Sequence, residues 1–220
     1  MEGYDRLRGK LNKFYFALIA ISLFIHSTCI FSKTSIGILP FENLTKKARF
    51  NWIGFGVEYI LYNKLANVSA FYVPEQKLIK RALKTTGYNP NKLDGRMVYH
   101  IGKEALINIV VVGSYQTDGK EIILNLKVMN ASSGATILTK DYDKPITELF
   151  SISDDIVQSI IQLASVTLSD KENIIVNRNI ASSVRAFEYF CLGYVENEKP
   201  RKRYEIIISL FRKAIRDDQN

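Results

Sequence analysis

The stretch INIVVVGSYQTDGKEIILNLKVMNASSGATILTKDY, residues 107–142, decides the fold of this chain. It contains three runs of branched and aromatic residues, which favour strands, separated by two turn sequences. The run 107–115 is almost continuously apolar, which predicts a strand covered on both faces. In 121–129 the apolar residues alternate with polar ones, which predicts one buried face. The dipeptide Asp-Gly at 118–119 is typical of a hairpin. Together with the run 135–142, the stretch predicts an antiparallel three-strand meander.

On both sides of this meander, short apolar runs and helical periodicity complete the pattern. The segment TSIGILP (34–40) and the segment AFYV (70–73) predict two more strands. Apolar residues spaced three and four apart predict amphipathic helices. The predicted helices span 53–65, 74–83, 95–106 and 146–168. Strands and helices in this order predict an α/β fold, in which a mixed sheet is flanked by helices.

The amino terminus has the composition of a targeting segment. Residues 14–32 contain no charged side chain, and Lys10 and Lys13 precede them. A basic start, an apolar core and small polar residues are typical of a signal peptide. An uncleaved anchor that contacts the membrane through 14–32 and a lipid attached to Cys29 are the alternatives. Residues 1–32 are therefore interpreted as a signal peptide or membrane anchor, and the expected location is the periplasm or cell envelope.

The residues of the remaining chain do not suggest a catalytic site, a metal site or a cofactor site. Cys191 falls on the apolar face of a predicted helix, so a buried, inert thiol is expected. His100 is expected to be an ordinary surface residue. Asp154 and Asp155 are adjacent, so on a helix they point in different directions and are expected to be solvated. We predict no catalytic residue, no metal site and no cofactor. The net charge of +8 comes from basic residues that are scattered along the sequence rather than clustered.

Five segments resemble the TolB amino-terminal-like domain in their order and spacing. They are ILPFENL (38–44), GFGVEYILYNKL (54–65), VVVGSYQTDG (110–119), LKVMNASSGATI (126–137) and LFSISDDIVQSI (149–160). The resemblance covers about residues 34 to 166. It departs from the family at Asn108, where the family usually has Asp. That domain is similar in fold to the curli-export and penicillin-binding-protein-activator lipoproteins. The resemblance implies protein–protein assembly at the cell envelope without catalysis.

After a polar linker at 169–182, residues 183–220 resemble a single tetratricopeptide repeat. The consensus positions are occupied by Tyr189, Leu192, Gly193, Phe211 and Ala214. Two antiparallel helices, 184–196 and 202–217, are expected to form an αα-hairpin with these residues in its seam. The alternative is an ordinary αα-hairpin docked on the α/β domain, which spans 33–168.

The outer face of this helix pair is expected to be uncovered. A lone repeat cannot bury its hydrophobic face, and about three are needed for a stable stack. Either the array continues in a longer protein or the pair covers the domain itself. We expect Ile207 and Leu210 to lie on the uncovered face and to bind a partner or a second copy of the chain.

Three classes of function follow. The first is a non-catalytic cell-envelope scaffold or assembly factor that binds protein partners through the α/β domain and the repeat helices. The second is a nucleic-acid or anionic-surface binding protein, although the scattered charge gives no reason to expect nucleic acid as a partner. The third is a hydrolase with an unrecognised site.

Overall fold

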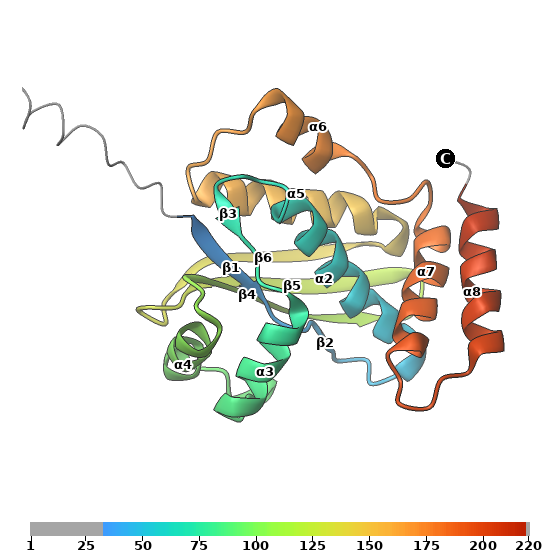
Figure 1. The fold of residues 1–220 in the computed structure, drawn as a ribbon, viewed down its shortest axis with the longest axis horizontal. Coiled ribbons are helices and arrows are strands. Elements are labelled where there is room, and N and C mark those ends of the chain that lie inside the picture. The colour runs from blue at the N-terminus through green and yellow to red at the C-terminus, as the bar shows by residue number, and fades with distance from the viewer. Residues whose placement is uncertain (1–32, 219–220) are drawn as a thin grey trace, which may run out of the picture. The chain divides into compact units, whose positions relative to one another are not determined.

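A computed structural model describes residues 33–218, which form an α/β fold with a mixed six-stranded sheet and seven α-helices (Figure 1). The predicted α/β class with a mixed sheet and flanking helices is therefore confirmed. The predicted signal peptide or anchor at 1–32, with Cys29, lies outside the described residues. Among the described helices, none combines the length and the apolar character that a bilayer span requires.

The sheet has the order β3-β1-β4-β5-β6, with the short β2 also paired to β4. β1 is parallel to β3 and β4, whereas β4 to β6 are consecutive antiparallel neighbours. The strands are β1 (Thr34–Ile38), β2 (Glu42–Asn43), β3 (Phe71–Tyr72), β4 (Ile109–Thr117), β5 (Glu121–Asn130) and β6 (Thr136–Pro145). The long β6 forms one edge of the sheet, and the two-residue β3 forms the other.

Helices pack on both faces of the sheet (Figure 1). One core contains side chains from α2, α5, α6 and α7, and a second, smaller core contains side chains from α3 and α4. The helices are α2 (Asn51–Leu65), α3 (Gln76–Thr86), α4 (Gly95–Ala105), α5 (Leu149–Leu163), α6 (Asp170–Asn177), α7 (Val184–Asn197) and α8 (Tyr204–Asp217). Three short 3-10 turns, Ala48–Phe50, Pro90–Lys92 and Ile146–Glu148, complete the described elements.

The central strand β4 is covered on both faces, as its apolar sequence predicts. Val111 and Tyr115 point into the larger core, and Val110 points into the smaller one. In β5 the buried side chains of Leu124 and Leu126 alternate with the more exposed Ile123. This alternation agrees with the period of two that the sequence shows.

Asn108, the departure from the family pattern, connects β1 to β4. Its Oδ1 accepts hydrogen bonds from the backbone N–H of Ser35 (3.2 Å) and from the Ser35 hydroxyl (2.7 Å). The backbone N–H of Asn108 in turn donates to Ser35 Oγ at 3.0 Å. These bonds need an acceptor oxygen at position 108, and an amide supplies one as well as a carboxylate does.

The end of α5 and the segment that follows it differ from the sequence prediction. The helix predicted over 146–168 ends at Leu163, because Ser165 adopts a left-handed conformation (φ 52°) that reverses the chain. The segment 169–182 was predicted as a linker, yet it contains α6. Ser169 and Glu172 cap each other's backbone at the start of α6, and this capping box stabilises the helix.

Candidate functional site

The helix α7 is part of the larger core. Phe187 (1% exposed) and Cys191 (0% exposed) pack against α2. Gly56 permits this approach, because a Cβ at that position would lie 3.0 Å from the Phe187 ring. Burial raises the pKa of the Cys191 thiol, which agrees with the inert thiol expected from the sequence. The helix pair α7–α8 therefore covers the α/β core through α7.

The five predicted consensus residues of the repeat have different surroundings. Gly193 and Phe211 meet directly, and Ala214 is buried at 8% exposure. Tyr189 is half-buried, and the Lys213 ammonium of α8 lies 5.4 Å from its ring centre. Leu192 packs against the larger core.

The two predicted partner-binding residues are not on the exposed face of α8. Ile207 is buried, with 6% of its surface exposed, and Leu210 is half-buried. Both positions are on the side of α8 that also carries Ala214, because residues three and four apart share a helix face. The prediction that Ile207 lies on the uncovered face is therefore wrong. Predicting this phase required knowing which of two apolar stripes faces α7.

The second stripe of α8 is the exposed one. Tyr204, Ile208 and Ile215 are 65%, 49% and 75% exposed, and the half-buried Phe211 lies between them. Spacings of four, three and four residues place these side chains on one face. A surface groove runs beside the stripe. Its lining residues are Glu205, Ile208, Ser209, Arg212, Lys213 and Arg216. We call the three exposed residues Tyr204, Ile208 and Ile215 the α8 stripe, whereas Phe211, at its edge, packs against Gly193 of α7.

The loop between α7 and α8 is fixed by one buried carboxylate. Glu196 is 6% exposed and accepts from Lys199 Nζ at 2.5 Å and from Arg203 Nε at 2.7 Å. These two cations lower the pKa of Glu196 to about 2. The ion pairs of Glu196 connect the end of α7 to the residue that precedes α8 and so contribute to the orientation of the α8 stripe.

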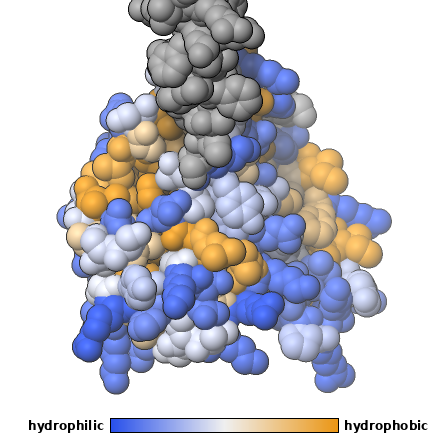
Figure 2. Space-filling model, turned by 60° about the vertical axis from the view of Figure 1, so that its left-hand side comes forward, coloured by the Kyte–Doolittle hydropathy of each residue, from blue (hydrophilic) through white to orange (hydrophobic). Residues whose placement is uncertain are grey.

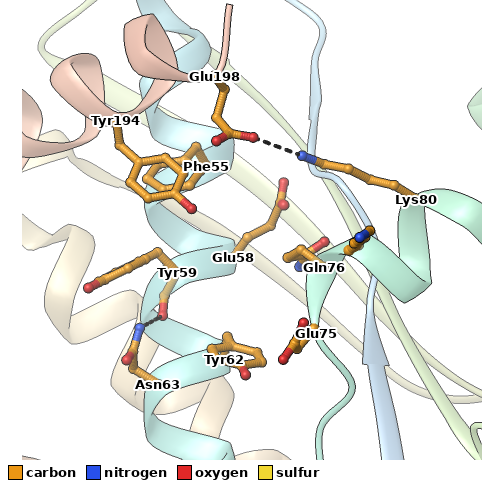
Figure 3. A pocket seen from close by; sticks show the side chains of 11 residues that line it. Phe55, Glu58, Tyr59, Tyr62, Asn63, Glu75, Gln76, Lys80, Tyr194 and Glu198 are labelled. Carbon is orange, nitrogen blue, oxygen red and sulfur yellow. Dashed lines mark hydrogen bonds and ion pairs between the residues drawn. The ribbon is translucent and has the colours of Figure 1, made fainter. Parts of the chain in front are cut away.

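A cleft of about 530 Å³ lies beside α2, between α3 and the end of α7 (Figure 3). Its aromatic lining residues are Phe55, Tyr59, Tyr62 and Tyr194. The rings of Phe55 and Tyr194 stack with their centroids 4.6 Å apart. The remaining lining residues are Glu58, Asn63, Glu75, Gln76, Lys77, Lys80 and Glu198. The cleft therefore combines an aromatic wall with several carboxyl groups.

Glu58 is the most perturbed acid of this cleft. It projects from α2 toward α3 (Figure 3), and its Oε1 accepts a hydrogen bond from the Phe41 backbone N–H at 3.1 Å. Burial raises the pKa of the Glu58 carboxyl to about 7, although the Phe41 hydrogen bond and the charge of Lys80 both lower it. At neutral pH the carboxyl is therefore poised between its protonated and ionised forms.

The cleft was not predicted from the sequence. Glu58, Tyr59 and Tyr62 are polar and aromatic positions of an amphipathic helix, and in the sequence they resemble an ordinary solvated face. Residues from α3 and α7 complete the site, and their proximity depends on how α7 docks on α2. The spacing of Phe55, Tyr59 and Tyr62, at positions i, i+4 and i+7, is the one available signal of an aromatic face.

Of the two adjacent carboxylates of α5 that were predicted to be solvated, Asp155 is exposed, as predicted, whereas Asp154 is half-buried in an ion pair. Asp154 forms an ion pair with Lys64, whose side chain is 3% exposed. Asp155 accepts hydrogen bonds from Lys140 Nζ and the Tyr142 hydroxyl, each at 2.7 Å. These bonds lower the pKa of Asp155. The pKa of the Tyr142 hydroxyl is raised, mainly by burial and also by its hydrogen bond to Asp155. Both acids are structural, since each connects α5 to a neighbouring element.

Hydrophilic and apolar residues are mixed on the face that Figure 2 shows, and the apolar side chains form groups separated by hydrophilic ones. His100 is exposed, as predicted, and its ring lies 5.6 Å from that of Tyr99. Within residues 33–218 no three His, Cys, Asp or Glu side chains are grouped so that they could hold a metal ion.

No protein-family model matches the chain. Among curated proteins, the putative adenylate cyclase 3 of Rhizobium meliloti (strain 1021) is 21% identical over 141 residues. The match covers 64% of this chain but 22% of that protein, so the chain spans about a fifth of the relative's length.

Several solved structures are similar to part of the chain. TolB from Acinetobacter baumannii is 15% identical with a TM-score of 0.45, covering 63% of this chain and 30% of TolB. The LpoB C-terminal domain from Salmonella enterica is 16% identical with a TM-score of 0.39, and the match covers 56% of this chain and 90% of that domain. Lipoprotein GNA1162 from Neisseria meningitidis is 11% identical with a TM-score of 0.43, and the match covers 62% of this chain and 99% of the lipoprotein.

Proposed function

We propose that this protein is a non-catalytic scaffold or assembly factor of the cell envelope. In this proposal, residues 33–168 form a TolB amino-terminal-like domain and 183–220 a single repeat of tetratricopeptide type docked on it. The targeting pattern at 1–32 and the sequence resemblance over 34–166 support the location and the class. α6 connects the two parts, because its Val176 belongs to the larger core.

The observation that carries the proposal is the α8 stripe. Three large apolar side chains on one face of a helix, each about half or more exposed, form the kind of patch that marks an interaction surface. Helical repeats bury such faces against a neighbouring helix. The occupant that fits is therefore an amphipathic helix of another protein or of a second copy of the chain.

The test is a double substitution on the stripe, Ile208→Ser with Ile215→Ser. We expect it to abolish co-purification of partners from a membrane-derived envelope fraction and to lower any self-association measured by sedimentation velocity. Ile174→Ser is the matched control, because Ile174 of α6 is 69% exposed and lies off the stripe. Deleting α7 and α8 would be a poor test, since Phe187 and Cys191 belong to the core.

A second candidate function is binding to an anionic surface. Arg212 and Arg216 line the groove beside the stripe, so α8 presents basic and apolar side chains together. Arg212→Glu with Arg216→Glu separates the candidates. If this double variant no longer sediments with anionic vesicles but still binds its protein partners, the basic residues of α8 serve binding to an anionic surface rather than binding to a protein.

A further inference from the structure

The cleft beside α2 has the size and lining of a small-ligand site. Its volume of about 530 Å³ falls within the range of small-molecule pockets, roughly 300–1,000 Å³. Three elements contribute to it, and the stacked rings of Phe55 and Tyr194 join α2 to α7 along one wall. A rigid wall of this kind offers contact area to an alkyl or aromatic group at little entropic cost.

One hydrogen-bond acceptor in the lining of the cleft lacks a donor, and a second can accept further hydrogen bonds. Gln76 Oε1 is buried and has no hydrogen-bond partner within residues 33–218, while Gln76 Nε2 donates to the Ile38 carbonyl at 3.3 Å. Glu58 receives one hydrogen bond, at Oε1 from Phe41. An ionised carboxylate has room for several more. A buried acceptor without a donor is costly, so this part of the cleft favours a group that donates.

The charges around the cleft favour a cationic group when Glu58 is ionised. Glu58, Glu75 and Glu198 contribute three carboxyls against the ammonium groups of Lys77 and Lys80. Lys80 is held by Glu198 at 3.8 Å, and both side chains are more than half exposed, so this pair is weak and solvated. Aromatic faces also attract cations, by about 0.5–2 kcal/mol in general.

We propose that this cleft binds a primary alkylammonium group, whose N–H donors reach Glu58 and Gln76 Oε1 while its alkyl stem lies against Phe55, Tyr59 and Tyr194. The inference goes beyond the proposed function and does not depend on the α8 stripe. The same chemistry occurs in a free amine and in the lysine side chain of a partner. A quaternary ammonium lacks N–H donors and cannot satisfy the two acceptors.

The protonation of Glu58 makes binding depend on pH. Titratable and polar groups from several elements surround the Glu58 carboxyl. They are Tyr59 and Tyr62 of α2, Glu75, Gln76, Lys77 and Lys80 at α3, Tyr88 after α3, Tyr115 of β4, and Tyr194 and Glu198 at α7. Because its carboxyl has a pKa of about 7, Glu58 is mostly ionised at pH 8 and mostly protonated at pH 5.5. Affinity for a cation therefore rises with pH over this range, and binding releases a proton near pH 7.

The experiment titrates n-butylammonium into the full chain and follows binding by calorimetry and by nuclear Overhauser contacts to aromatic rings. We expect saturable binding at pH 8, contacts from the butyl chain to Phe55, Tyr59 or Tyr194, and affinity at least about tenfold weaker at pH 5.5. Losing one charge-assisted hydrogen bond weakens binding by about tenfold or more, so Glu58→Gln should do the same at pH 8 and should also abolish the pH dependence. Glu104→Gln, an exposed carboxylate of α4, is the control.

Two further probes separate the sources and the alternatives. Binding of acetyl-Gly-Lys-Gly-amide at least as tight as that of n-butylammonium assigns the cleft to a lysine side chain, and weaker peptide binding assigns it to a free amine. Tetramethylammonium that binds as tightly as n-butylammonium would overturn the role of the N–H donors. Absence of ring contacts from both amines would overturn the site. Thermal unfolding of Glu58→Gln shows whether a lost signal reflects a lost fold.

Discussion

Gly193 of α7 faces the ring of Phe211 in α8 so closely that a Cβ at position 193 would lie 2.8 Å from Phe211 Cε1. This contact sets the separation of the two helices. It also fixes the rotation of α8, which buries Ile207 and exposes Ile208. The glycine and the phenylalanine thus determine which apolar stripe of α8 remains uncovered.

We expect Gly193→Ala to destabilise the chain by about 1–3 kcal/mol, as overpacked contacts do, although alanine is the better helix former. Denaturant unfolding measures the change. The double variant Gly193→Ala with Phe211→Leu should recover part of the loss, because the smaller side chain makes room for the methyl group. A Gly193→Ala protein as stable as the wild type would show that the helices can separate freely.

Leu124 of β5 and Ile156 of α5 are fully buried in the larger core. Replacing either with alanine should lower the free energy of unfolding by about 2–5 kcal/mol. Ile123→Ala is the matched control, since Ile123 is 43% exposed on the opposite face, and it should cost less than about 0.5 kcal/mol. Equal losses of unfolding free energy for Ile123→Ala and Leu124→Ala would contradict the conclusion that Leu124 lies on the buried face of β5 and Ile123 on the exposed one.

The strands and most helices could be predicted because their apolar periodicity is local. The alternation in β5 and the continuous apolar run in β4 need no knowledge of partners. The ion pair of Lys64 with Asp154 could not be predicted, because it joins residues 90 positions apart on two helices that each look solvated there. The same reason applies to the cleft around Glu58, which three separate helices assemble.

Removing Asp154 should leave the ammonium of Lys64 buried and unpaired. We expect Asp154→Ala to cost about 2 kcal/mol, a value below that of a fully buried pair because Asp154 is 32% exposed. The double variant Lys64→Met with Asp154→Ala should recover most of this loss, since an apolar side chain then replaces the unpaired cation. If the double variant is less stable than Asp154→Ala, the pair is not the source of the effect.

Glu58 should make the stability fall as the pH rises. Its pKa is raised in the folded protein from about 4.5 to about 7. Between these values the folded state holds a proton that the unfolded state has lost, so unfolding becomes easier with increasing pH. Glu58→Gln should remove this slope and should be more stable than the wild type at pH 8, by about 2 kcal/mol. Parallel pH profiles of the two proteins between pH 4.5 and 7.5 would contradict the raised pKa.

Site-specific photocrosslinking shows whether the α8 stripe contacts a protein partner in the envelope. A photoreactive amino acid replaces Ile208 or Ile215 in the full chain, expressed from Met1. The same residue at Leu106, which is 77% exposed after α4, is the control. We expect discrete protein adducts in the envelope fraction from positions 208 and 215 and none from position 106. Adducts of equal yield at all three positions, or at none, would contradict the proposed binding of a partner by the stripe.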